Sequence, residues 1–307
     1  MAFIPLVTIV TIDGIVTTVT ARERGENPDP ARRLFNPSQR SRMNSASVLT
    51  ASVAKRPAPG VSTYSLEALP WRDMPRGTAR EKCVRRDDEA GRYLGLIAFD
   101  PLSRSGVHQH LGTATSYILS GSLTDHQLTA REGQVGINLA GATHDAVSYP
   151  GCLLVSRLEG PVVIPDGGLA IHPHASAAPL QAASPEMPPD IMVDLAAALP
   201  IPTRFGGVSR RNLFDYAGTG DDRRMVSLTL WPRAPGLRVH HSDITDLFVM
   251  AGDLRVDGEA VSGPAFVLIE PDREVTLSSE WGCCLLAWAE GPARCVETGA
   301  ELYGFGA

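Results

Sequence analysis

The sequence is poor in lysine and has no long apolar segment. Only Lys55 and Lys82 are lysines, and 28 Lys and Arg against 34 Asp and Glu give a formal net charge of −6. A mildly acidic chain lacks the basic surface of a nucleic-acid-binding protein, so we expect no nucleic-acid partner. The sequence also has no P-loop, no Gly-x-Ser-x-Gly motif and no Gly-x-Gly-x-x-Gly motif after a strand, which argues against nucleotide binding and serine hydrolysis.

The five cysteines do not form a recognisable redox or zinc motif. They lie at positions 83, 152, 283, 284 and 295, and no two of them have C-x-x-C spacing. Their number is odd, and Cys283 and Cys284 are adjacent inside an apolar run, which indicates buried structural thiols rather than a disulfide framework. We therefore expect a reducing, cytoplasmic location.

The segment 1–62 differs in composition from the rest of the chain and is predicted to be an N-terminal extension. The apolar runs 7–12 and 15–20 flank Asp13-Gly14, a strong local signal for a β-hairpin. This start has no cationic region or cleavage site of a signal peptide and is too polar for a membrane span, so we expect no membrane association. The stretch 21–62 is rich in Arg, Pro and Ser, which predicts a disordered arm.

Met43 lies inside this arm and is an alternative start of translation. The strong excess of Arg over Lys indicates GC-rich coding, in which reading frames stay open upstream of true starts. A start at Met43 would remove the segment 1–42 and leave the two predicted domains and their linker intact.

An internal repeat divides the rest of the chain. The segment 92–161 superposes on the segment 223–292 without a gap, with Gly121 on Gly252 and His110 on His241. Turn signals recur at short, regular intervals in each copy, as in all-β sandwiches and barrels. We expect an all-β fold with a first domain at 63–165, an Ala/Pro-rich linker at 166–202 with one short helix at 191–199, and a second domain at 203–307.

Three histidines of the first copy are candidate metal ligands. His108 and His110 are two apart on a predicted strand, and side chains two apart on a strand point to the same face. His144 follows a turn glycine, Gly141, and would complete a three-histidine site. Three neutral imidazoles suit Fe, Zn, Cu or Ni.

These residues resemble the motifs of the cupin superfamily. The matching positions are His108, His110, Gly121, Gly141 and His144, and the repeat indicates a bicupin. The resemblance implies two double-stranded β-helix (jelly-roll) barrels. Within the superfamily, the first copy is similar to proteins related to 2,4'-dihydroxyacetophenone dioxygenase and to the cupin module of zinc-binding anti-sigma factors.

The resemblance also implies a chemistry. We assign the position of the family's glutamate ligand to Thr115, a poor ligand, which leaves open positions on the metal. Tyr117 shares the strand parity of Thr115, and we expect both side chains to shape the pocket. By resemblance, such three-histidine cupins hold Fe(II) and use O2 to cleave a C–C bond next to a carbonyl, here in a small diketone or hydroxyaryl ketone.

Two other functions remain open from the sequence. One is a non-catalytic zinc- or ligand-binding regulatory cupin, and the other is a metal-dependent isomerase or cyclase. Iron would favour the oxygenase, and tightly bound zinc would favour the other two. We expect a small-molecule partner and either a monomer or a homodimer.

Several further residues are weaker candidates. At the metal-site positions the second copy has Val239, His241, Asp246 and Val275, of which only His241 keeps the residue of the first copy. This predicts a degenerate site kept for packing, dimerisation or pocket shape. The pair His172 and His174 is expected to lie in a solvated linker loop. His126 is expected at the surface or at the pocket rim, and Asn138 is a candidate pocket residue. Two arginine pairs, at 210–211 and 223–224, are expected on solvated faces.

Overall fold

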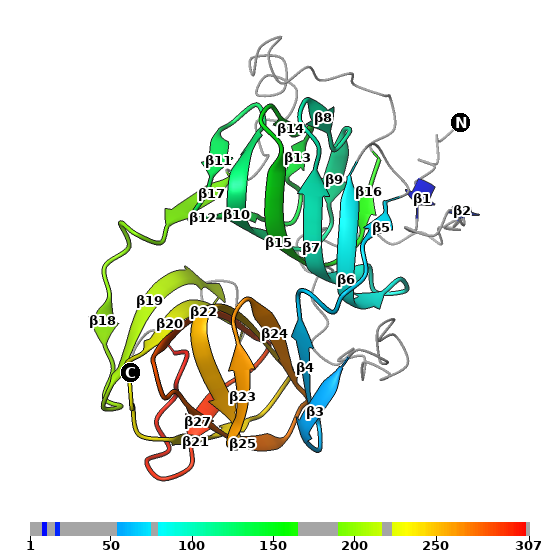
Figure 1. Cartoon of the computed structure of the whole chain (residues 1–307). Helices are drawn as coiled ribbons and strands as arrows, with labels where there is room; N and C mark the ends of the chain where they lie inside the picture. The colour runs from blue at the N-terminus through cyan, green and yellow to red at the C-terminus, as the bar shows by residue number, and fades with distance from the viewer. Residues whose placement is uncertain are drawn as a thin grey trace, which may run out of the picture. The chain divides into compact units, whose positions relative to one another are not determined.

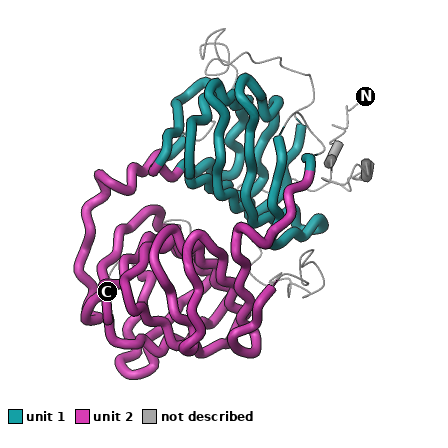
Figure 2. Tube along the Cα trace, in the orientation of Figure 1, with its two compact units in different colours: residues 1–49, 73–132, 136–191 teal, residues 50–72, 133–135, 192–307 magenta. Residues whose placement is uncertain are grey.

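The computed structural model describes two short strands, at residues 8–10 and 16–18, and residues 54–74, 79–164, 190–216 and 223–304. The expected all-β fold is confirmed, because the described residues form strands and turns without an α-helix. They divide into two compact units, one built mainly from residues 79–164 and the other mainly from residues 192–304 (Figure 2). Among the described residues, no helix is long and apolar enough to cross a membrane.

The first unit is a barrel of antiparallel strands (Figure 1). Its strands are β5 (Arg72–Asp73), β6 (Arg80–Asp87), β7 (Arg92–Phe99), β8 (Ser103–Arg104), β9 (His108–His110), β10 (Ala114–Thr124), β11 (Thr129–Arg131), β12 (Gln134–Asn138), β13 (Thr143–His144), β14 (Val147–Ser148), β15 (Cys152–Glu159), β16 (Val162–Val163) and β17 (Ile191–Asp194). The larger sheet has the order β17-β12-β10-β15-β7-β6-β5, with β8, β11 and β14 at its side. The smaller sheet is β13-β9-β16.

The second unit repeats this plan in one twelve-stranded sheet. Its strands are β3 (Lys55–Ala58), β4 (Val61–Ser65), β18 (Ile201–Pro202), β19 (Val208–Asp215), β20 (Arg224–Leu230), β21 (Leu237–His241), β22 (Thr245–Val256), β23 (Glu259–Ser262), β24 (Ala265–Ile269), β25 (Arg273–Ser278), β26 (Cys283–Ala289) and β27 (Ala293–Cys295). The main path is β18-β19-β20-β26-β22-β24-β4-β3, and β21, β23, β25 and β27 branch from it.

The two units share one strand register, at the same constant offset as the repeat in the sequence. In the first unit Gly121 of β10 lies opposite Cys152 of β15, and in the second Gly252 of β22 lies opposite Cys283 of β26. Both strand pairs also contain a bulge at the same place, after Ile118 and after Val249. The repeat seen in the sequence is therefore a repeat of the backbone.

The domain boundaries differ from those expected. Strand β4 (Val61–Ser65) overlaps the expected start of the first domain, yet it pairs with β24 and completes the sheet of the second unit. The segment 191–199 is not a helix, because residues 191–194 form β17 beside β12 in the sheet of the first unit. Ile, Met and Val in this run favour an extended strand that pairs with a sheet edge. Each repeat thus gives its leading strand to the sheet of the other.

The N-terminal extension is only partly described. Strands β1 (Thr8–Val10) and β2 (Val16–Thr18) pair antiparallel, as expected for the hairpin. The predicted disordered arm ended at position 62, but β3 and β4 already begin at Lys55 and Val61. The alternative start Met43 and the pair His172 and His174 lie outside the described residues.

The turn at Gly121 fixes how β10 approaches the end of β15. Its φ is +75°, a left-handed conformation that glycine adopts without steric cost. A Cβ at this position would lie 2.0 Å from the carbonyl oxygen of Gly151. Gly252 repeats both features, with φ at +85° and the carbonyl oxygen of Gly282 at 2.0 Å. Glycine is therefore required here for close backbone approach as well as for φ.

We predict that Gly121→Ala destabilises the protein much more than Gly133→Ala. Gly133 also has positive φ, +80°, but a Cβ there would meet nothing within 4 Å. In the control variant Gly133→Ala, the free energy of unfolding should fall only by the cost of the left-handed conformation, about 1–2 kcal/mol. Gly121→Ala must also displace the Gly151 backbone, and we expect a loss of roughly 3 kcal/mol or more. Urea unfolding of both variants measures the difference, and equal losses would contradict the close-approach argument.

Candidate metal centre

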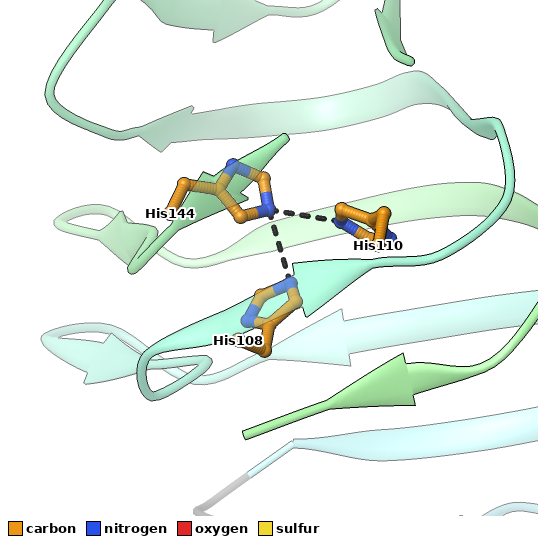
Figure 3. Close-up of side chains that lie close together, drawn as sticks. All are labelled: His108, His110 and His144. Atoms are coloured by element: carbon orange, nitrogen blue, oxygen red, sulfur yellow. Dashed lines mark hydrogen bonds between the residues drawn. The ribbon is translucent and has the colours of Figure 1, made fainter. Parts of the chain in front are cut away.

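The structure brings the three predicted histidines together. His108 and His110 project from the same face of β9, and His144 of β13 lies directly opposite His108 in the antiparallel pair. The Nε2 atom of His144 lies 3.0 Å from Nε2 of His108 and 3.1 Å from Nε2 of His110 (Figure 3). One nitrogen from each ring therefore converges on a single point between the two strands.

This arrangement fits a transition-metal ion. Two nitrogens that each lie about 2.1 Å from one ion, at about a right angle, are roughly 3 Å apart. The observed separations of 3.0 and 3.1 Å match that spacing. Three imidazole nitrogens facing one another are poor hydrogen-bond partners unless a proton or a cation lies between them, so the donor set itself favours a cation.

The local environment keeps at least one ring neutral, as metal binding requires. His110 and His144 are buried, and His108 is partly exposed. Burial, and then the neighbouring His108 and His144, hold the pKa of His110 well below its usual value. A neutral His110 presents a free nitrogen lone pair to an ion.

Hydrogen bonds at Nδ1 orient two of the three histidine rings. The Nδ1 atom of His108 lies 2.8 Å from the carbonyl oxygen of Gly106, to which it donates its proton. The Nδ1 atom of His144 lies 2.9 Å from Oδ2 of Asp125. Both contacts place the ring proton on Nδ1 and leave Nε2 free for a metal. Within the described residues, Nδ1 of His110 is buried without a hydrogen-bond partner.

Strand register places Ala114, rather than the expected Thr115, on the interior face of β10 next to the histidines. In the second unit, Thr245 is the repeat counterpart of Ala114, and its hydroxyl lies 3.0 Å from Nδ1 of His241. His241 corresponds to His110, so the position shared by Ala114 and Thr245 faces the equivalent histidine in both barrels. The first barrel thus has a methyl group where the second has a hydroxyl.

Thr115 and Tyr117 lie on the opposite face of β10, because side chains alternate along a strand. Their counterparts Asp246 and Phe248 are buried but do not belong to the interior core of the second barrel, which contains Leu247 between them. The interior position, Ala114, lies one residue before the expected position, so both predicted pocket residues lie on the outer face. Their expected role in shaping the pocket is therefore not supported by the register.

The interior of the first barrel is more polar than that of the second. Ser116 and Ser156 lie opposite each other on β10 and β15, and Gly95 of β7 follows in the same row. The corresponding residues of the second barrel are Leu247, Ala287 and Val226, all within its apolar core. The first barrel therefore has hydroxyl groups on the interior face that also carries Ala114.

Among the described residues, the second barrel has no group of three candidate metal ligands like the histidines of the first. Val239, His241 and Val275 are fully buried, and they lie with the core that includes Tyr303 near the C-terminus. The ring of Tyr303 is 6.0 Å from that of His241. Burial, and then the nearby His240, lower the pKa of His241 to about 3. Apolar side chains thus fill the place that the histidines occupy in the first barrel.

Two carboxylates near the site, Asp125 and Asp190, were not predicted from the sequence. Asp125 accepts from His144, and oxygens of Asp125 and Asp190 and a ring nitrogen of His144 lie within 4.8 Å of one another. Burial alone would raise the pKa of Asp125, but the hydrogen bond from His144 and the electrostatic interaction with that ring hold it well below its usual value. Burial, and then the charge of Asp125, raise the pKa of Asp190 to about 7. Asp190 follows two prolines in a stretch without periodicity, so no local signal identifies it.

The weaker sequence candidates have other roles. The amide of Asn138 donates to Oδ1 of Asp190 at 2.6 Å rather than marking a pocket by itself. His126 is buried rather than at the surface, and neither ring nitrogen has a hydrogen-bond partner in the described part of the chain. Burial lowers its pKa. Arg210 is buried, which corrects the expectation of a solvated face for that residue.

Comparisons with known proteins agree with this architecture. Residues 61–161 match the family model described as the ChrR cupin-like domain. Among solved structures, a proposed dioxygenase from Nostoc punctiforme is similar with a TM-score of 0.58 at 10% identity, covering 77% of this chain and 85% of that one. Two variants of oxalate decarboxylase OxdC from Bacillus subtilis are similar with TM-scores of 0.51 and 0.52 at 13% identity, covering 76% of this chain and 79% of theirs. No curated protein matches the sequence.

We predict that His241 makes the protein sensitive to acid. With a folded pKa of about 3, His241 stays neutral in the folded protein while the unfolded chain takes up a proton near pH 6.5. Stability is therefore lost as the pH falls from about 6.5 to about 3, by up to roughly 1.4 kcal/mol per pH unit for this one proton.

The variant His241→Asn should make the free energy of unfolding less dependent on pH, by the equivalent of up to one bound proton. Urea unfolding between pH 4 and 7 measures it. His240→Asn is the matched control, because His240 is the exposed neighbour on the same strand. The prediction is wrong if the two variants show the same pH slope as the unmodified protein.

Proposed function

We propose that this chain is a metal-dependent oxygenase of small carbonyl compounds, because its residues 61–161 match a cupin-like family model and its first barrel brings three histidines together. The proposal places Fe(II) on His108, His110 and His144. The substrate class is a small diketone or hydroxyaryl ketone, and the products arise by cleavage of a C–C bond next to the carbonyl with O2. Zinc or another transition metal would fit the same three nitrogens.

The observation that carries the proposal is a group of three histidines without a fourth His, Cys, Asp or Glu ligand among the described residues, beside an interior face of β10 where Ala114 adds only a methyl group. A structural metal site is closed by four protein ligands, whereas a catalytic site keeps positions for substrate. A methyl group cannot bind a metal, so three neutral imidazoles would leave the ion its full charge and an open face. Such a site favours a bidentate anion, and the enolate of a diketone or hydroxyaryl ketone offers two oxygens of that kind.

The chain's own residues would prepare this site. Gly106 and Asp125 hold the rings of His108 and His144 with Nε2 facing inward. Bound Fe(II) would supply a Lewis acid for the substrate oxygens and a redox centre for O2. The interior hydroxyls of Ser116 and Ser156 would give hydrogen bonds to the oxygen-bearing part of a substrate. The apolar interior of the second barrel offers no such groups at these positions.

A second candidate function has its own support. The matching family model is named after the cupin-like domain of ChrR, and we noted above the similarity of this copy to zinc-binding anti-sigma factors. A non-catalytic, zinc-binding regulatory cupin would use the same three histidines without turning over a substrate. The open fourth position favours the enzyme, because a regulatory zinc site gains from a fourth protein ligand.

The function is tested by O2 consumption. Full-length protein loaded with Fe(II) is assayed with a panel of β-diketones and hydroxyacetophenones, and products are identified by mass spectrometry. We expect substrate-dependent O2 uptake with two carbonyl-containing fragments. His144→Ala, with the same iron added, should show background uptake only. Full iron occupancy with no turnover across the panel would overturn the oxygenase, and tightly held zinc in protein from its native host would favour the regulatory function.

We predict that Ala114→Glu closes the open face. A carboxylate in this column can reach the metal as a fourth ligand, so zinc affinity should rise by about tenfold or more while O2 uptake with substrate falls by a similar factor. Ala114→Gln is the matched control, because it adds the same volume without a charged ligand. Competition with a chromogenic chelator measures affinity. Equal affinity of the two variants would show that this column does not face the metal.

A further inference from the structure

A chain of polar contacts leads from His144 to the segment that precedes the second repeat. Asp125 accepts from Nδ1 of His144 through Oδ2, at 2.9 Å. Its other oxygen, Oδ1, accepts from the backbone nitrogens of Gln127 and Leu128 at 2.9 and 3.0 Å. The turn that follows β10 therefore fixes Asp125, and Asp125 in turn fixes the ring of His144.

Asp190 is attached to this turn from outside the repeat. Its backbone nitrogen donates to Oε1 of Gln127 at 3.0 Å, and its Oδ1 accepts from Asn138 at 2.6 Å. Its other oxygen, Oδ2, is buried without a hydrogen-bond partner in the described residues. An oxygen of Asp190 lies within 4.8 Å of both Asp125 and His144. Asp190 is therefore held beside the carboxyl group that accepts from His144.

We propose that Asp190 is a positioning residue that acts through Asp125 to hold His144 for metal binding. Held beside Asp125, the carboxyl group of Asp190 can donate a hydrogen bond to it, and Asp125 accepts the Nδ1 proton of His144. The Nε2 lone pair of His144 then points at the metal. Asp190 lies beyond residues 61–161, so the site of the first barrel depends on the segment that leads into the second repeat.

The proposal rests on the proposed metal site but not on its chemistry. It is therefore tested without turnover, by two readouts on full-length protein. One is the tautomer of His144, observed in metal-free protein by ¹⁵N–¹H correlation NMR of the imidazole rings. The other is Zn²⁺ affinity, measured by competition with a chromogenic chelator. Outer partners of metal-binding histidines typically change affinity by about 10–100-fold when removed.

We expect Asp190→Ala to weaken Zn²⁺ binding by about tenfold and to shift His144 away from the Nδ1–H tautomer. Asp194→Ala is the matched control, because Asp194 is an exposed aspartate at the other end of β17. Asp190→Asn should restore both readouts to within about twofold, since an amide keeps the acceptor for Asn138 and can donate to Asp125. This conservative variant also guards against the loss of folding in Asp190→Ala.

The double variant decides whether Asp190 acts through Asp125. Asp125→Ala alone should weaken Zn²⁺ binding by at least as much as Asp190→Ala, and adding Asp190→Ala should then change nothing further. Additive losses, or a wild-type tautomer and affinity in Asp190→Ala, would overturn the proposal and leave Asp190 as an anchor of β17. If the variants behave as expected but Fe-loaded protein consumes no O2, the proposed oxygenase fails and this inference stands.

Discussion

The candidate site depends on strand register. Side chains alternate along a strand, so a slip of one residue would turn every side chain to the other face. His108 and His110 share the interior face of β9 because they are two apart, and His144 meets them because it pairs directly with His108. The close approach of the turn at Gly121 to Gly151 fixes the neighbouring pair of β10 and β15. The backbone thus sets the convergence of three ring nitrogens before any ion is present.

The two barrels show what this register permits and what it does not determine. Their paired strands superpose at one offset, including the bulges, yet only the first barrel carries three histidines and interior serines among the residues that the structure describes. In the second, valines and the C-terminal Tyr303 fill the corresponding space, and His241 remains as a buried neutral ring bonded to Thr245. Apolar filling favours stability, whereas a barrel that binds a ligand must keep polar groups inside. The duplication therefore allows one copy to stabilise the molecule while the other keeps the candidate metal site.

The sequence predicted the features that are local or repeated. His-x-His spacing, turn glycines and the constant offset of the repeat depend on strand periodicity and on positive φ, which can be recognised without a structure. The prediction failed where the path of a loop matters. The connection between His110 and β10 decides whether Ala114 or Thr115 lies on the interior face, and residue spacing across that loop does not predict which one. The sheets to which β4 and β17 belong could not be predicted either, because strand partners far apart in the chain leave no local signal.

Asp190 is the clearest case of a residue that only the fold can identify. It follows Pro188-Pro189 in an Ala/Pro-rich stretch, where an aspartate would ordinarily be taken for a solvated side chain. The exchange of β17 into the sheet of the first barrel brings it beside Asn138 and Gln127. The same exchange that moved the domain boundary therefore also supplies a buried carboxyl group to the surroundings of His144. The strand that joins the two repeats is, on this argument, part of the site as well as part of the scaffold.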